Sequence, residues 1–360
     1  MIRADVVVVG AGVIGLTTAW ALVQAGRQPL VLDAGAPAAE ASWAGGGIVC
    51  PVPPWRYPDP INALVARSRA LFPDLIQSLE RSSGEDCEYR VSGLLLVGEL
   101  ADQGRDWLAR GQPDTSTGVA ADFEPELRPP AVPAILLEQI PQVRNPRLAR
   151  ALVGALGRHG VPVRGHAEVT RIRWDGDCVV GIVTAGGEVI KAADVVVATG
   201  AWTDQLLAGS GLIGLGIEPV RGQMLLFAPR RPLLRHIVNH GRGYFIPRRD
   251  GRILAGSSVE RVGFDRRPQR AFYEQTLATA RSCLPALSES DVECQWLGFR
   301  PAIAGELPAI GAYPGVRGLW LNAGHFRNGL GMAPAAAELL VRQMQGDGAA
   351  ASFQVRPVQA

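Results

Sequence analysis

A glycine-rich turn between two short apolar segments stands at the start of the chain. Residues 5–9, DVVVV, predict a buried parallel strand, because the run is short, continuous and β-branched. GAGVIG follows, with Gly10, Gly12 and Gly15 in the GxGxxG spacing, and LTTAWALVQAG then predicts a helix. PLVLD predicts a second strand that closes with Asp33. The order of strand, glycine turn, helix, strand and acid predicts a dinucleotide-binding α/β unit.

Each part of this unit has a physical task. Gly10 allows the tight turn, Gly12 lets the backbone approach a pyrophosphate, and Gly15 lets helix and strand pack closely. The helix N-terminus attracts phosphate charge, and Asp33 can accept hydrogen bonds from ribose hydroxyls. Ala34 follows the acid and no arginine is there to receive a 2′-phosphate, so NADP is disfavoured.

The next segment decides between FAD and NAD. Residues 40–49, EASWAGGGIV, hold a hydroxyl and three successive glycines directly after the second strand. Such a loop suits a flavin ring laid against backbone, because glycines permit close approach and expose N–H donors. Trp43, Ile48 and Val49 are too apolar for a flexible surface loop. Later, DVVVATGAW (194–202) repeats a strand and glycine turn but lacks GxGxxG, so we expect one FAD and no second nicotinamide site.

Composition limits the partners of the chain. The hydrophobic fraction of 47%, the charged fraction of 19% and the net charge of +2 are those of a globular protein without a nucleic-acid partner. Lys191 is the single lysine among 36 basic residues, so the run with Arg230, Arg231 and Arg235 is expected to be solvated surface. Five cysteines without CxxC spacing predict reduced thiols and no metal site. No signal peptide and no apolar run of about 18 residues is found, so we expect a cytoplasmic chain without stable membrane association.

The hydrophobic pattern predicts two domains, each formed by segments that are not continuous in the sequence. Residues 1–85, 145–210 and 300–360 are expected to form the FAD-binding domain, and 86–144 and 211–299 a substrate domain. Alternation in QMLLFA, GYFIPR and GRILAGSSV predicts an antiparallel sheet in the second domain. The fold class is therefore α/β, a Rossmann-like domain with an added antiparallel sheet. The last residues, DGAAASFQVRPVQA, are expected to be a loosely held tail.

These motifs, with GFRPAIAGELPAIG (298–311) and GHFRNGLGMAPAAAELL (324–340), resemble the D-amino-acid oxidase family of flavoenzymes across nearly the whole chain. Within the family the likeness is to the glycine oxidases of bacterial thiazole biosynthesis. GHFRNGLGMAP is its sharpest motif, and SWAGGGIVCPVPPWRYPDP and QVRNPRLARAL also carry it. The resemblance and the motifs together give the expected cofactor-binding residues: Gly10, Gly12, Val13, Ile14, Gly15, Asp33, Ala34, Glu40, Ala41, Ser42, Gly45, Gly46, Gly47, Val169, Thr199, Gly200, His325, Phe326, Arg327, Asn328, Gly329, Leu330 and Gly331.

The resemblance also implies the catalytic residues. Arg300 matches the position that holds the substrate carboxylate, a task suited to a planar fork that stays charged. Arg327 would reach the substrate side, and Tyr244 would stand over the substrate. The helix after the GHFRNG loop would point its positive end at the flavin, where negative charge develops on reduction. The GFRP region has no cysteine, so the FAD is expected to be non-covalent.

The implied reaction is oxidation of glycine or a similarly small amine. Hydride would pass from the neutral amine to flavin N5, and oxygen would reoxidise the flavin to give hydrogen peroxide. The imine would hydrolyse to glyoxylate and ammonia or supply the thiazole of thiamine, and the family habit is a homotetramer.

Two other interpretations stay open at this point. One is a D-amino-acid or secondary-amine dehydrogenase that passes electrons to a quinone, and the other is a flavin-binding protein without turnover. Gly47 and Val259 stand where larger thioether side chains occur in other glycine oxidases, so an enlarged pocket is expected to admit sarcosine or small D-amino acids.

Overall fold

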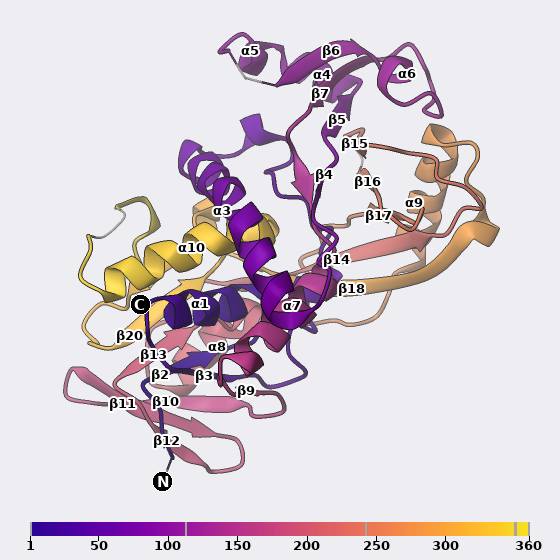
Figure 1. Cartoon of the computed structure of the whole chain (residues 1–360). Coiled ribbons are helices and arrows are strands. Elements are labelled where there is room, and N and C mark those ends of the chain that lie inside the picture. Colours follow the sequence, from indigo (N-terminus) through magenta and orange to yellow (C-terminus); the bar gives the residue numbers. More distant parts are fainter. Residues whose placement is uncertain (1, 112–113, 242, 349–350, 359–360) are drawn as a thin grey trace.

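A computed structural model describes residues 2–111, 114–241, 243–348 and 351–358 of the chain. Within these residues the chain forms a mixed α/β fold, with a six-stranded and a four-stranded sheet at one end and an eight-stranded sheet at the other (Figure 1). The predicted class, α/β with an added antiparallel sheet, is confirmed. The proposed division of the sequence into two domains stays a prediction.

The six-stranded sheet contains the predicted valine strand. β2 pairs in parallel with β3 and β13, and its side chains alternate between two hydrophobic clusters, Val6 and Val8 on one face and Val7 and Val9 on the other. A strand that is buried on both faces needs the continuous run seen in the sequence. The sheet order is β19 (Ala309–Ala312), β20 (Leu319–Ala323), β13 (Asp194–Val197), β2 (Val6–Val9), β3 (Pro29–Leu32) and β9 (Val163–Arg164).

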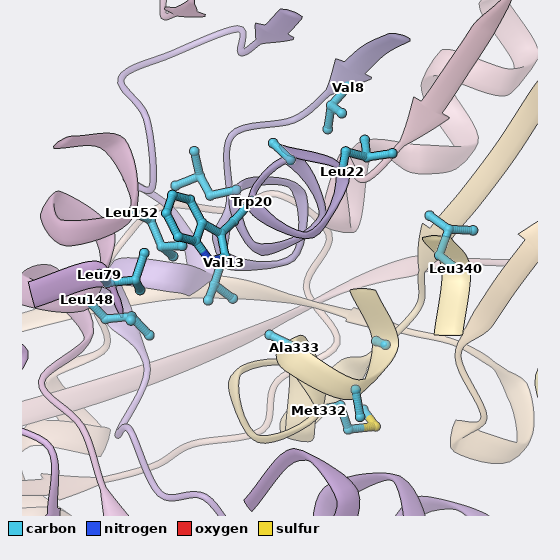
Figure 2. Close-up of a cluster of buried hydrophobic side chains, with 14 of the residues drawn as sticks. Val8, Val13, Trp20, Leu22, Leu79, Leu148, Leu152, Met332, Ala333 and Leu340 are labelled. Carbon is cyan, nitrogen blue, oxygen red and sulfur yellow. The ribbon is translucent and has the colours of Figure 1, made fainter. Parts of the chain in front are cut away.

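Helices cover one face of this sheet. Figure 2 shows Val8 of the sheet next to Leu22, and Val13 and Trp20 on the same helix as Leu22. Leu79, Leu148 and Met332 come from three other helices and belong to the same cluster. Burial of such side chains stabilises the fold by about 1.5–3 kcal/mol each. The four helices are α1 (Val13–Gln24), α3 (Asp59–Ser83), α7 (Asn145–Arg158) and α10 (Gly329–Met344).

A smaller sheet covers the other face. Its hairpin, β10 with β11, packs with α8 (Thr203–Gly209) against the inner valines of the six-stranded sheet. The sheet order is β1 (Ile2–Arg3), β12 (Val189–Lys191), β11 (Cys178–Thr184) and β10 (Val169–Asp175).

The eight-stranded sheet extends away from these layers along two long strands, β14 and β18 (Figure 1). All of its pairs are antiparallel except β15 with β5. One face packs against α9 (Arg270–Cys283). Its order is β18 (Val292–Ala302), β14 (Glu218–Phe227), β17 (Ile253–Gly256), β16 (Tyr244–Pro247), β15 (Ile237–Asn239), β5 (Leu94–Val97), β7 (Pro133–Leu137) and β6 (Thr115–Val119).

Short elements complete the fold, and the C-terminal segment differs from the predicted loosely held tail. The remaining α-helices and strands are α2 (Ala41–Ala44), α4 (Glu99–Gln103), α5 (Arg105–Leu108), α6 (Ala120–Phe123) and the paired strands β4 (Arg90–Val91) and β8 (Pro141–Gln142). The described part of the C-terminal segment, residues 351–358, is not a loose tail. Phe353 and Val355 are each 7% exposed and belong to two different hydrophobic clusters, and Val358 N–H donates to the carbonyl of Gly214. Apolar burial outweighs the polar composition of this segment.

Candidate active site

A cavity of about 660 Å³ begins at the glycine turn and ends at the eight-stranded sheet. Its walls include the residues that follow β2, β3 and β13, so it lies at the carboxyl ends of the parallel strands, where ligands of open α/β sheets bind. The far end is formed by β16, β18 and the first turn of α10. The cavity therefore joins the two ends of the molecule.

The three glycines of the turn meet three different constraints. Gly10 has φ +104°, and a Cβ there would lie 2.4 Å from the carbonyl oxygen of Ala198. Gly12 lines the cavity. Gly15 does not line it: a Cβ there would lie 1.8 Å from the carbonyl oxygen of Gly10, so this glycine permits contact between helix and strand.

Asp33 holds the turn in place. One carboxylate oxygen accepts the N–H of Ala11 at 2.6 Å and the other accepts the N–H of Gly35 at 2.8 Å. Burial raises the pKa of Asp33 in spite of these two hydrogen bonds. The carboxylate faces the cavity as well, and its contact with a ribose stays a prediction.

The glycine loop 45–47 forms the wall between the turn and the sheet. The interpretation that Gly47 enlarges the pocket is wrong, because a Cβ at this residue would lie 2.0 Å from the carbonyl oxygen of Val143. Glycine is required at this position because the backbone of Val143 leaves no room for a side chain. Trp43, which is too apolar for a flexible surface loop, is 41% exposed and meets Trp296 edge-on with ring centroids 5.2 Å apart.

Arg300 projects from β18 into the end of the cavity. Its guanidinium donates to Ser257 Oγ at 2.7 Å and to the carbonyl oxygen of Ser258 at 3.0 Å, and both acceptors are neutral. The side chain crosses the strand β14 at Gly222, where a Cβ would lie 2.0 Å from Nη1. Burial lowers the pKa of Arg300, and the nearby charge of Arg327 acts in the same direction.

Two phenols and a second arginine complete this end of the cavity. Arg327 is exposed and has no hydrogen-bond or ion-pair partner among the described residues. Tyr57 is hydrogen-bonded to the side chain of Asn328, and burial raises its pKa although the charge of Arg327 opposes the shift. Tyr244 O–H points to Met224 Sδ at 3.7 Å. Four groups that can bind a carboxylate therefore meet here: two guanidinium groups and two phenols.

His325 lines this end of the cavity. The side chain is buried, its Nε2 has no hydrogen-bond partner in the described structure, and burial lowers its pKa to about 3. His325 is therefore neutral throughout the physiological range and adds no charge to the cluster.

All but one of the residues expected at the site line this cavity, and the exception is Gly15. Their functional roles stay predictions. Val259 does not line the cavity: it is 50% exposed and faces a second cavity of about 450 Å³ between the sheet and α9. The expectation that Val259 shapes the main pocket is therefore wrong.

Sequence reasoning missed several lining residues. Tyr57 and Asn145 lie in the quoted segments RYPDP and QVRNPRLARAL, and Ser257 lies in GRILAGSSV, yet no local spacing singles them out. Arg266 was also missed; it stacks over Phe299 at 5.2 Å and pairs with Glu40 at 2.7 Å. Only the fold brings these segments together.

Two negative findings concern the described residues. None of their helices is both long and apolar enough to cross a membrane. No group of three or more His, Cys, Asp or Glu among them is arranged to hold a metal ion.

Comparison with known proteins agrees with this geometry. The family model described as FAD-dependent oxidoreductase, DAO, matches residues 5–343. A glycine oxidase of Pseudomonas putida is 41% identical over 348 residues, which cover 95% of this chain and 94% of that protein. A glycine oxidase of Pseudomonas aeruginosa is 41% identical over 347 residues, with coverage of 95% and 94%. The crystal structure of glycine oxidase from Geobacillus kaustophilus superposes with a TM-score of 0.93 at 29% identity and covers 100% of both chains.

Proposed function

The chain belongs to the DAO family of FAD-dependent oxidoreductases and is an FAD-dependent amine oxidoreductase, and from this premise we propose that it oxidises glycine and similarly small amino acids. One observation carries the proposal: Arg300 and Arg327 stand together at the end of the cavity, and neither forms an ion pair with a carboxylate of the described residues. Two cations without a counter-charge favour an anionic ligand. A substrate carboxylate is such a ligand.

The residues of the cavity fit FAD. The cavity is long, and it joins a dinucleotide-type turn to a loop of glycines at which side chains would collide: a Cβ at Gly46 would lie 2.7 Å from Ile246. Gly10, Gly12 and Asp33 would hold the adenosine and pyrophosphate part, and Gly45–Gly47 with the first turn of α10 would hold the ring. GFRP has no cysteine, so we expect no covalent link.

The proposed role of Arg300 is to bind and orient the substrate carboxylate. Two of its five N–H groups are used by Ser257 and Ser258, and the guanidinium also hydrogen-bonds to Tyr244, so the remaining N–H groups are left for a ligand. Arg327 and the hydroxyl groups of Tyr244 and Tyr57 would add further donors. Such clamps supply much of the rate enhancement by fixing the reacting Cα–H in place.

The same cations favour a reactive amine. A positive field lowers the pKa of an ammonium group bound beside it, so the substrate amine would lose its proton on binding and expose its lone pair. FAD, when bound, would supply the redox chemistry, as the acceptor of a hydride from Cα whose electron pair oxygen then takes up as hydrogen peroxide. The imine product takes up water to give glyoxylate and ammonia. We also propose that the imine can supply the thiazole of thiamine, and that the enzyme works as a cytoplasmic homotetramer.

The proposal is tested by anaerobic mixing of the holoenzyme with glycine, sarcosine and D-alanine in turn, followed by admission of air. Rapid bleaching by glycine, with recovery of the yellow colour and one peroxide per turnover, is the expected result. The ranking of the bleaching rates identifies the preferred amine. Bleaching with slow recovery in air would assign the chain to a dehydrogenase instead, and no bleaching by any of the three would refute the substrate assignment.

A further inference from the structure

A buried arginine lies directly behind the glycine loop. Arg248 is 9% exposed; its Nη2 donates to the carbonyl oxygen of Gly46 at 3.0 Å, and its Nη1 donates to Gln142 Oε1 at 3.0 Å and the carbonyl oxygen of Val143 at 3.3 Å. All three acceptors are neutral. Burial lowers the pKa of Arg248 to about 10, so the guanidinium is still charged at neutral pH.

The hydrogen bond to Gly46 fixes the orientation of the next peptide group. The peptide is planar and trans, so when the carbonyl of Gly46 points to Arg248 the N–H of Gly47 points the opposite way. Gly47 is buried and lines the cavity, and its N–H meets no acceptor among the described residues. Buried N–H groups are almost always paired. This donor therefore requires a ligand atom.

A cation without a carboxylate partner is costly at such a position. Transfer of a charge into the protein interior is unfavourable unless it is compensated, and neutral carbonyl groups compensate only in part. Among the described residues no acid lies within ion-pair distance of Arg248; the nearest acids that affect it, Glu88 and Asp250, pair with Arg144. The field of Arg248 is therefore free to act on the cavity.

We propose that Arg248 is a positioning residue of the FAD site: it holds the Gly46–Gly47 peptide so that the N–H of Gly47 donates to the isoalloxazine ring, and its charge stabilises the negative charge that the ring acquires. Fixed donors and charges aimed at a site of developing charge act strongly, because no reorganisation is needed when the charge appears. The inference rests on FAD as the cofactor and not on the identity of the amine.

Sulfite is a suitable probe, because it needs no amine substrate. Its lone pair adds to the oxidised ring, which becomes anionic, so its dissociation constant measures how well the protein stabilises charge there. The holoenzymes of wild type, Arg248→Gln, Arg248→Lys and the control Arg249→Gln would be titrated at constant ionic strength. Arg249 is exposed and pairs with Asp86, so its replacement makes the same change in net charge one residue away.

The expected result is sulfite binding at least tenfold weaker in Arg248→Gln, with wild-type behaviour in Arg249→Gln. A matching fall of the reduction potential by about 30 mV is expected for each tenfold loss in this two-electron couple. Arg248→Lys retains the charge and is expected to lose less than Arg248→Gln. Sulfite affinity within twofold of wild type in an FAD-saturated Arg248→Gln holoenzyme would overturn the proposal.

A structural role alone would give a different pattern. If Arg248 only ties the loop to residues 142–143, its replacement weakens FAD retention but leaves sulfite affinity unchanged in the loaded fraction. If Arg248→Gln cannot be isolated with FAD, Gln142→Ala decides, because it removes one anchor of the guanidinium and leaves the charge. A threefold or larger loss of sulfite affinity in Gln142→Ala supports the proposal, and no loss contradicts it.

Discussion

At the scale of single residues, the placement of Arg300 depends on the absence of a side chain elsewhere. Arg300 lies in the cross-strand pair with Val220, and its guanidinium turns over the next residues of β14, where Gly222 leaves room. Gly222 itself pairs with Gly298, whose Cβ would lie 2.8 Å from Cβ of Ala44 in α2. Cross-strand partners point to the same face of a sheet, so the two glycines clear one face of the strand pair, Gly222 for the guanidinium of Arg300 and Gly298 for the helix α2.

Gly222→Ala is expected to displace the Arg300 guanidinium and lower kcat/KM for glycine by about 10²-fold, since a shift of about 1 Å in a substrate-binding group has that effect. Gly222 does not line the cavity, so FAD binding should not change. The measurement is steady-state kinetics with an FAD titration. Gly157→Ala is the control, because a Cβ there meets nothing within 4 Å; equal kinetics in both variants would contradict the expectation.

Arg300→Lys tests the carboxylate contact itself. A lysine keeps the charge but loses the planar fork, so one charge-assisted hydrogen bond to the carboxylate disappears, a loss of about 1.5–3 kcal/mol. We expect kcat/KM for glycine to fall about 10–100-fold. Activity toward methylamine, which has no carboxylate, should change less than threefold. The ratio of the two substrates is the measured quantity, and an unchanged ratio would remove Arg300 from carboxylate binding.

At the scale of elements, one loop connects the site to the sheet. The segment 257–269 provides both acceptors of Arg300 and places Arg266 against the cavity. It is fastened by Arg221, which is 2% exposed and donates to Glu260 at 2.8 Å and to the carbonyl oxygens of Asp265 and Arg267. Buried Arg221 therefore holds the segment 257–269 in place, and this segment in turn positions the guanidinium of Arg300.

Glu260→Gln would leave buried Arg221 with only the more distant carboxylate of Asp265, at 3.5 Å, and loss of one partner of a buried pair costs about 3–5 kcal/mol. Because Glu260 retains some exposure, we expect the lower end, about 3 kcal/mol, in urea unfolding. KM for glycine should rise as the loop loosens. Glu293→Gln, in an exposed pair with Arg252, should change stability by less than about 1 kcal/mol. Comparable losses in both variants would refute a special role for Arg221.

The sequence could predict single elements but not the contacts between elements that lie far apart in the chain. The strand, glycine turn and helix of residues 6–24, and the helix that begins at Gly329, are local patterns in which spacing determines geometry. Ser257, Tyr57 and Arg248 reach the site from segments far apart in the chain, and no local period reports such contacts. The errors have the same cause. Gly47, Val259 and the C-terminal segment were interpreted by size or composition, whereas their backbone neighbours decide their environment.

At the scale of the whole molecule, buried groups link stability to pH. Burial lowers the pKa of His325 from an ordinary 6.5 to about 3, so between these values the unfolded chain binds a proton at this residue that the folded chain does not. Stability is then fully present above pH 6.5 and falls as the pH decreases toward 3. Carboxylates whose pKa is lowered, such as Glu260 and Asp265, act in the same direction but only near and below pH 4.5.

Between pH 6.5 and 5 the contribution of His325 can therefore be measured apart from that of the carboxylates. With FAD in fixed excess, the unfolding free energy from urea titration should fall by up to about 1.4 kcal/mol per pH unit in this window. His325→Gln should flatten that slope, because glutamine has no proton to exchange, even if its absolute stability is lower. His159→Gln, at an exposed histidine that meets Trp20 edge-on, is the control and should keep the wild-type slope. If His325→Gln also keeps the wild-type slope, the pH dependence of the unfolding free energy does not originate at His325.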